Sequence, residues 1–163
     1  MNRQALVSGG IAVVVVAAAL AGILLSSRRN RLQLTGEILK VRSHQTDSDH
    51  TLALIDLRIH NPSPQQFQLK EIEVFVDDPD GTSTQADLFA ESDVQRMLDY
   101  YPMLGAKYNP GLLRKDKIRV GQTVDRTIAA NIPITDERLG QRKRLRIVLH
   151  DADGPVIEID EKR

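Results

Sequence analysis

The stretch Ala53–Val76, ALIDLRIHNPSPQQFQLKEIEVFV, decides which fold this chain can adopt. Apolar side chains occupy every second position on both sides of a proline-containing break, first at Ala53, Ile55, Leu57 and Ile59 and then at Ile72, Val74 and Val76. A period of two is typical of half-buried β-strands. The break, Asn61-Pro62-Ser63-Pro64, ends the first strand, because proline has no backbone N–H to donate to a neighbouring strand. The stretch therefore predicts strands at Thr51–His60 and Phe67–Val76.

Another strand is expected before this stretch. Leu32, Leu34 and Ile38 indicate that strand, with Gly36 as a bulge or bend. The polar segment Ser43–His50 then indicates a loop.

Alternation resumes in the last third of the chain. The segments 124–134 and 145–149 place apolar residues at every second position, with Arg126 as the charged exception. Asp151-Ala152-Asp153-Gly154 predicts a hairpin into Val156–Ile159. About seven short strands joined by turns predict a mainly β fold. The expected architecture is an antiparallel β-sandwich of immunoglobulin-like or fibronectin-like type.

The middle of the chain breaks the pattern of strands. Between Asp87 and Tyr101, apolar residues recur at helical spacing, and Pro102 stops the run. The segment Ser92–Gln95 fits a capping box at the start of a helix. We therefore expect one short helical insertion that covers an edge or an open end of the sheet.

The N-terminal segment Ala5–Leu25 contains no charged residue. At about 1.5 Å per residue it would extend about 31 Å, which matches the hydrocarbon core of a bilayer. A buried core helix and a signal peptide cleaved after Ala19-Leu20-Ala21 are the alternatives. The apolar run continues past the small residues to Leu25 and is followed by the arginines of the stem rather than by a polar mature sequence. We therefore predict an uncleaved, single-pass transmembrane helix that places the protein in the cell membrane.

Four segments follow from this interpretation: a tail at 1–4, the transmembrane helix at 5–25, a basic stem at 26–31 and the β-sandwich domain at 32–163. Small residues four apart in the helix suggest a homodimer that associates weakly through it.

The stem carries Arg28, Arg29 and Arg31, and the flank richer in Lys and Arg faces the cytoplasm. We therefore expect a cytoplasmic domain. Export of the domain, with the short N-terminus left inside, is the alternative.

Composition excludes several kinds of chemistry. The 22 basic and 22 acidic residues balance, and the chain has no cysteine, which removes disulfides, thiolate metal sites and a cysteine nucleophile. A nucleophile elbow and phosphate-binding glycine motifs are also missing. We expect no enzyme activity, no cofactor and no metal. The alternative is a metal-dependent hydrolase that uses the loop His44–His50, where two His and two Asp crowd together.

Two groups of residues are candidates for binding a protein partner or lipid. The first contains Tyr100, Tyr101 and Tyr108, because tyrosine is amphipathic and adapts to interfaces. The second is basic and contains Arg28, Arg29 and Arg31 in the stem and Arg142, Lys143 and Arg144 near the C-terminus. These cations could hold the domain against anionic headgroups. We do not expect a nucleic-acid partner, because aromatic residues do not alternate with the basic ones.

The segment Ala53–Val76 resembles the late-embryogenesis-abundant type 2 domain, also called the LEA14-like or water-stress and hypersensitive-response domain. The resemblance rests on Asn61-Pro62 at the end of an apolar strand and on Leu69, Ile72 and Val74 in the next strand. The later Val120–Thr123 is similar to the turn before the next strand of that family. The helical segment 87–101 departs from the family pattern. The resemblance implies a binding or protective module without catalytic residues and a stress-related role.

Overall fold

The computed structural model describes residues 33–161, which belong to a compact unit that runs from Leu32 to Arg163. In chain order the elements are β1 (Thr35–Gln45), β2 (Thr51–His60), β3 (Phe67–Asp77), β4 (Ser83–Gln85), β5 (Asp87–Leu88), α2 (Glu91–Tyr100), the 3-10 helix η1 (Pro102–Leu104), β6 (Lys117–Ile118), β7 (Thr123–Ile132), α3 (Asp136–Gln141), β8 (Arg144–Asp151) and β9 (Val156–Asp160).

The predicted tail, transmembrane helix and stem, residues 1–31, lie outside the described part of the chain. Among the residues that are described, no helix combines the length and the apolar character needed to cross a membrane.

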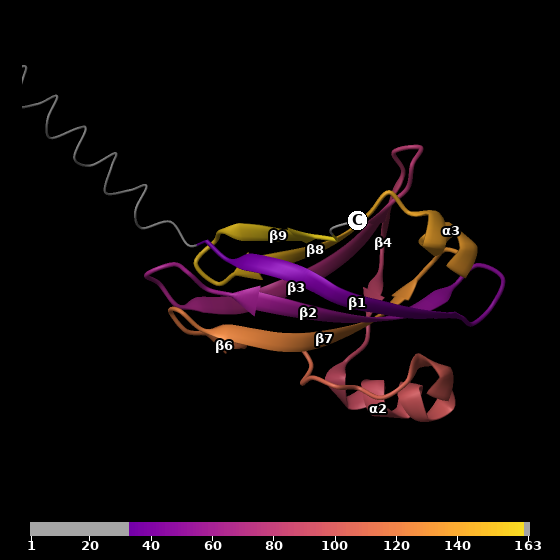
Figure 1. Ribbon diagram of the computed structural model, residues 1–163, viewed down its shortest axis with the longest axis horizontal. Helices are drawn as coiled ribbons and strands as arrows, with labels where there is room; N and C mark the ends of the chain where they lie inside the picture. Colours follow the sequence, from indigo (N-terminus) through magenta and orange to yellow (C-terminus); the bar gives the residue numbers. More distant parts are fainter. Residues whose placement is uncertain (1–32, 162–163) are drawn as a thin grey trace, which may run out of the picture. The chain divides into compact units, whose positions relative to one another are not determined.

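The strands form two antiparallel sheets that face each other (Figure 1). The first sheet has the order β1-β2-β7-β5; the second has the order β4-β3-β8-β9, with β6 also paired to β3. The fold is therefore mainly β, a β-sandwich, as the alternation of apolar residues predicts. The hairpin predicted at Asp151–Gly154 is present between β8 and β9.

The main core lies between the sheets, and β2 shows how the sequence builds it. Its inward side chains have no solvent-exposed surface: Ala53, Ile55, Leu57 and Ile59. The alternate residues of β3, β7 and β8 join the same cluster. Burial of one continuous apolar layer from both sheets is the main stabilising term of such a domain.

Gly36 has a different role from the one predicted. The irregularity in β1 falls between Ile38 and Lys40, where one extra residue lets both Ile38 and Val41 pack against the core. Gly36 lies inside the regular part of β1, and a Cβ on it would collide with the side chain of Ile159. Glycine therefore allows β1 of the first sheet and β9 of the second to approach closely.

The opposite side of the sandwich is bridged by a strand that changes sheets. Residues Ser83–Gln85 pair with β3 of the second sheet, and residues Asp87–Leu88 pair with β7 of the first. Between them the backbone N–H of Ala86 donates to the carbonyl of Val74 at 2.9 Å.

The two sequence motifs that carry the family resemblance meet in space. β2 ends at His60, and the next residue, Asn61, is buried. Its backbone carbonyl accepts from Gly121 N at 2.7 Å and its N–H donates to Gln122 O at 3.0 Å. Its side-chain amide also donates to the carbonyls of Gln65 and Ile118. Asn61 therefore joins the turn after β2 to the end of β6 and the turn that follows it.

Two predicted boundaries were wrong. β1 continues to Gln45, which pairs with Thr51, so the loop between β1 and β2 is shorter than the predicted Ser43–His50. α2 begins at Glu91 with Ala90 at its N-cap and no side-chain cap, so the predicted capping box at Ser92 does not form. The helix is held by its buried residues, Val94, Met97 and Leu98, rather than by a cap.

The prediction of a single helical insertion is also incomplete, because the domain contains two α-helices among the described residues. A second short helix, α3, follows Thr135, whose hydroxyl accepts from Arg138 N. Six residues are too few to show a helical period in the sequence.

α2 covers the outer face of the first sheet, not the edge or open end that the sequence suggested. Val94, Met97 and Leu98 of the helix pack on Leu52 and Leu54 of β2, together with Leu104 and Ala129. These residues form a second, smaller apolar cluster. The first sheet is thus covered on both faces.

Candidate binding surface beside helix α2

An open groove of about 540 Å³ lies between α2 and the loop that joins β1 to β2. It is called the α2 groove below. Its lining residues are Thr46, Asp47, Leu52, Phe89, Asp93, Arg96, Met97, Tyr100, Tyr101 and Asn131. Apolar side chains from the smaller cluster form part of this lining, and carboxylates and an arginine also contribute. A groove that is mostly apolar with a few polar groups is the usual form of a binding site.

Two of the predicted tyrosines line the groove. The rings of Tyr100 and Tyr101 meet edge to face with their centroids 4.9 Å apart. Tyr101 is half-buried against the ring of His44, at a centroid distance of 5.6 Å. Tyr100 points outward and is 77% exposed. The structure therefore brings these two residues together at one end of α2.

The third tyrosine belongs to the same surface. The Tyr108 ring lies beneath the guanidinium of Arg42, 5.1 Å from it, and is 71% exposed. Arg42 and His44 are two apart on β1 and so point to the same side of the strand. Tyr108 on Arg42 and Tyr101 on His44 therefore follow one another along β1. We call Tyr100, Tyr101, Met103 and Tyr108 the tyrosine surface.

A buried ion pair fixes the segment that carries this surface. Arg42 Nη2 lies 2.9 Å from Asp56 Oδ2, and both side chains are largely buried. Arg42 Nη1 donates to the carbonyls of Leu104 and Ala106, both at 2.7 Å. The arginine thus ties the chain after η1 to the sheet. Sequence analysis missed this pair, although an aspartate inside the apolar strand β2 was a signal, since a buried charge needs a partner.

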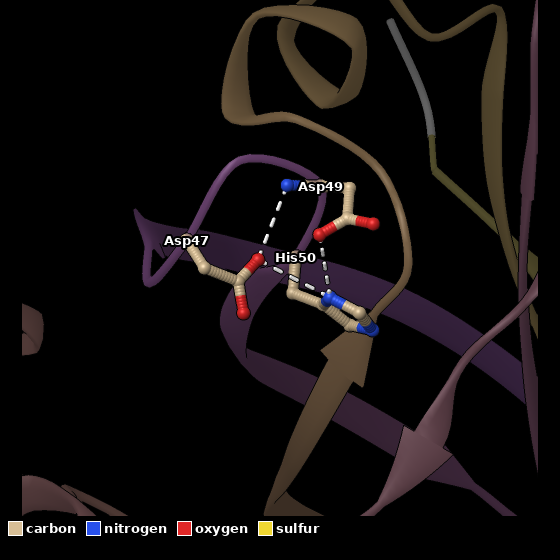
Figure 2. A group of neighbouring side chains, drawn as sticks. All are labelled: Asp47, Asp49 and His50. Carbon is tan, nitrogen blue, oxygen red and sulfur yellow. Dashed lines mark hydrogen bonds and ion pairs between the residues drawn. The ribbon is translucent and has the colours of Figure 1, made fainter.

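The loop that the hydrolase alternative would use brings three candidate ligands, two aspartates and one histidine, together at the rim of the groove. One ligand atom each from Asp47, Asp49 and His50 lies within 4.8 Å of the others. Figure 2 shows His50 Nδ1 between two carboxylate oxygens, 3.2 Å from each. Asp47 Oδ1 also accepts from the backbone N–H of Asp49 at 3.1 Å.

The protonation of this loop follows from those contacts. The hydrogen bond to Asp49 is the main cause that raises the pKa of His50, and Asp47 adds to it. The pKa of Asp47 is lowered, first by the backbone N–H of Asp49.

The other candidate histidine of the hydrolase hypothesis, His44, does not join this loop cluster, and neither does His60. His44 stacks on Tyr101, and His60, at the far end of β2, lies 2.9 Å from the hydroxyl of Thr123.

Two residues of the basic C-terminal candidate group make contacts within the domain. Arg142 is 8% exposed and forms two bonds to Glu161, at 2.9 and 2.6 Å. Arg144 lies 2.9 Å from Asp77, and Arg146, with Arg144, holds the pKa of Asp77 well below its usual range. Lys143 is exposed. Their role at a membrane stays a prediction, as does that of Arg28, Arg29 and Arg31, which lie outside the described residues.

A second cavity, of about 420 Å³, opens near the start of α2. Ile72, Leu112 and Ile128 contribute apolar surface to it. Its charged lining residues have partners: Glu91 pairs with Lys107, and Arg114 lies 4.0 Å from Glu71. This cavity lacks the exposed aromatic rings of the tyrosine surface.

Comparison with known proteins adds little to this description. No family model matches the chain, and no curated protein matches it. Among solved structures, it is similar to an uncharacterized β-sandwich protein from Clostridium difficile 630, with 15% identity, 82% of each chain covered and a TM-score of 0.35. The class of this protein, a β-sandwich, therefore follows from its own two sheets and the core between them.

Proposed function

We propose that this chain is a membrane-tethered, non-enzymatic binding module that engages a protein partner through the tyrosine surface. The observation that carries the proposal is the exposure of three large apolar side chains on one short segment: Tyr100 at 77%, Met103 at 63% and Tyr108 at 71%. Tyr and Met are enriched at protein interfaces and are costly to leave in water as a group.

The way this surface is held supports a binding role. Arg42 fixes the backbone at Leu104 and Ala106, on either side of a tight turn at Gly105, whose φ is 76°. A surface that is already ordered loses less conformational entropy when a partner binds. The buried pair with Asp56 thus serves binding by positioning Met103 and Tyr108.

We also propose that the β-sandwich is of immunoglobulin-like type, and the order of its strands supports this. Immunoglobulin domains place strands A, B, E and D in one sheet opposite C, F and G in the other. Counting strands along this chain, β1-β2-β7-β5 corresponds to the first set, and β3-β8-β9 corresponds to the second, with β4 as an added edge. The fold itself does not specify a function, so the proposal rests on the surface.

A protein is a better match than a bilayer for the α2 groove. The groove lies at the Gln45 end of β1, whereas the proposed tether joins the domain before Thr35. An 11-residue strand separates these ends by about 36 Å. The rim also carries Asp47, Asp49 and Asp93, which anionic headgroups would repel. The tether at 5–25, the cytoplasmic side, the weak homodimer and the stress-related role remain parts of the proposal that rest on sequence.

Site-specific photo-crosslinking in intact membranes tests the proposal. A benzophenone amino acid replaces Tyr100 or Tyr108 in the full chain, and Val156, exposed at the start of β9, serves as the control position. We expect a discrete protein adduct from the two tyrosine positions and none from position 156. The partner is then purified, and Met103→Ser should weaken its binding. Adducts with lipid alone, or equal adducts from position 156, would contradict the proposal.

The hydrolase alternative has its own test. Asp47, Asp49 and His50 could supply ligands to a divalent ion. Titration of the full chain with zinc chloride, followed by calorimetry, measures this directly. We expect no saturable binding of zinc that depends on His50, so the titrations of the unchanged chain and of His50→Gln should look the same. Saturable binding that His50→Gln removes, accompanied by ester or phosphoester hydrolysis, would favour the enzyme instead.

A further inference from the structure

The α2 groove has the shape to hold an extended segment of a partner chain. Leu52, Phe89 and Met97 supply apolar surface from a strand, a connecting segment and the helix. The loop residues Thr46 and Asp47 line the groove as well, and Tyr100 lies at the end of α2. An apolar side chain of a ligand could therefore be covered while its neighbours stay at the rim.

Charge at the rim favours a cation. Asp47 and Asp93 line the groove and are exposed, and Asp49 lies next to Asp47. Among the described residues that line the groove, Arg96 is the one fully charged cation, and His50 sits between the two loop carboxylates. The last turn of α2 contains no basic residue, so the negative end of the helix dipole is not offset there. The electrostatic balance of the groove is therefore negative.

The exposed tyrosine ring suits a cation as well. Two aromatic rings of this domain already carry an arginine on their face: Tyr108 under Arg42 at 5.1 Å and Phe75 under Arg146 at 5.0 Å. Tyr100 contacts Tyr101 edge to face, and most of its surface is open to solvent. A lysine or arginine of a ligand could lie over this ring in the same way.

From this combination we infer that the α2 groove recognises a short basic segment of a protein, in which a lysine or arginine pairs with Asp47 and Asp93 and packs on Tyr100 while a neighbouring apolar side chain enters the groove. The inference rests on the proposed function, because it names the chemistry of the partner at the same surface. Neutral or acidic segments would leave the negative balance of the rim, where Arg96 and His50 face three carboxylates, without further compensation.

Binding of labelled peptides to the full chain in neutral detergent tests this inference. The probes are fluorescein-labelled Gly-Lys-Leu-Lys-Leu-Lys-Gly and the same peptide with Glu or Ser in place of Lys, measured by fluorescence anisotropy at low and at 150 mM sodium chloride, about physiological ionic strength. The lysine peptide should bind at least about tenfold more tightly than the serine peptide, since several opposite charges act together. Its affinity should fall with salt.

Variants locate the binding. The double substitution Asp47→Asn/Asp93→Asn should weaken binding of the lysine peptide about three- to tenfold, as expected for two exposed ion pairs. Asparagine keeps an acceptor for the Asp49 N–H, so the loop should stay folded. Tyr100→Ala should weaken binding of the lysine peptide about two- to fivefold, as expected for an exposed cation–π contact. The matched control is Asp80→Asn with Asp153→Asn, which removes the same charge from two exposed turns outside the groove.

The outcomes separate the inference from the proposed function. Equal binding of the three peptides, preference for the glutamate peptide or an unchanged Asp47→Asn/Asp93→Asn variant would overturn the inference. If position 100 still crosslinked to a protein, the proposed function would stand although the inference about a basic segment had failed. A dimer seen in sedimentation and abolished by Asp47→Asn/Asp93→Asn would assign the groove to a second copy of this chain and would also overturn it.

Discussion

The two faces of the first sheet are built in different ways. The inner face is a continuous apolar layer that the second sheet covers completely. The outer face carries a small apolar cluster under α2 and, beside it, the buried pair of Arg42 and Asp56. The same strand, β2, contributes to both, with Ile55 inward and Leu54 and Asp56 outward. The difference assigns stability mainly to the inner face and the position of the binding surface to the outer face.

The largest loss of stability is expected when the inner face is disrupted. Ile55 has no exposed surface, and Ile55→Ala would leave a cavity that close-packed neighbours cannot fill. We expect a loss of about 2–5 kcal/mol. Hydrogen exchange under native conditions should show faster exchange in β2, β3, β7 and β8 together, because they share one core. An effect limited to α2 would contradict the assignment of stability to this face.

The next largest loss of stability is expected when the polar part of the outer face is disrupted. Asp56→Ala leaves Arg42 without its carboxylate in a largely buried position, which typically costs about 3–5 kcal/mol. Part of this energy is recovered because Arg42 keeps two carbonyl partners and some contact with water. We therefore expect less destabilisation than for Ile55→Ala in urea unfolding. Amides of residues 104–108 should exchange faster than those of β3.

A double variant separates stability from positioning. In Arg42→Met/Asp56→Leu the buried charges are replaced by apolar groups, a change that is often neutral. The domain should regain most of its stability, but the carbonyls of Leu104 and Ala106 lose their common donor. Partner binding at Tyr108 should stay weak. Recovery of both stability and binding would show that the pair does not position the tyrosine surface.

A smaller effect concerns the apolar part of the outer face. Met97 is buried in the cluster that joins α2 to Leu52 and Leu54. Met97→Ala should cost about 2 kcal/mol, at the low end for such changes, because the groove beside it lets the site relax. Exchange should increase in α2 and stay unchanged in β3 and β8. Arg96→Ala, at an exposed position on the same helix, serves as the control.

This contrast also explains what the sequence could predict. The inner face follows from local alternation, because each strand has to bury every second side chain against the other sheet. Leu52 and Leu54 also appear in the sequence, but nothing local says that α2 covers them. Arg42 and Asp56 are 14 residues apart and belong to different strands, so their pairing depends on strand register. Tyr100, Tyr101 and Tyr108 were found because they are close in sequence, whereas the acidic rim joins residues 47 and 93 from distant segments.

The smallest expected effect lies at the rim, where the outer face meets the loop. The hydrogen bond to Asp49, assisted by Asp47, raises the pKa of His50 above its ordinary value of 6.5. The charged imidazolium is thus favoured in the folded chain. Its contribution to stability is complete below about pH 6.5 and is lost as pH rises through the folded pKa. Because the loop is exposed, this contribution should be small.

An NMR titration of the histidine rings measures it. The His50 midpoint should lie above 6.5 and should move down in Asp49→Asn. Amide exchange is compared with its intrinsic rate at each pH. His50→Gln should remove a slight pH dependence of the resulting protection in the loop 46–50 and leave the protection of β2 and β3 unchanged. His60→Gln is the control, because the His60 ring contacts the neutral hydroxyl of Thr123. A pH-dependent change in the protection of the inner-face strands would mean that the two faces are coupled.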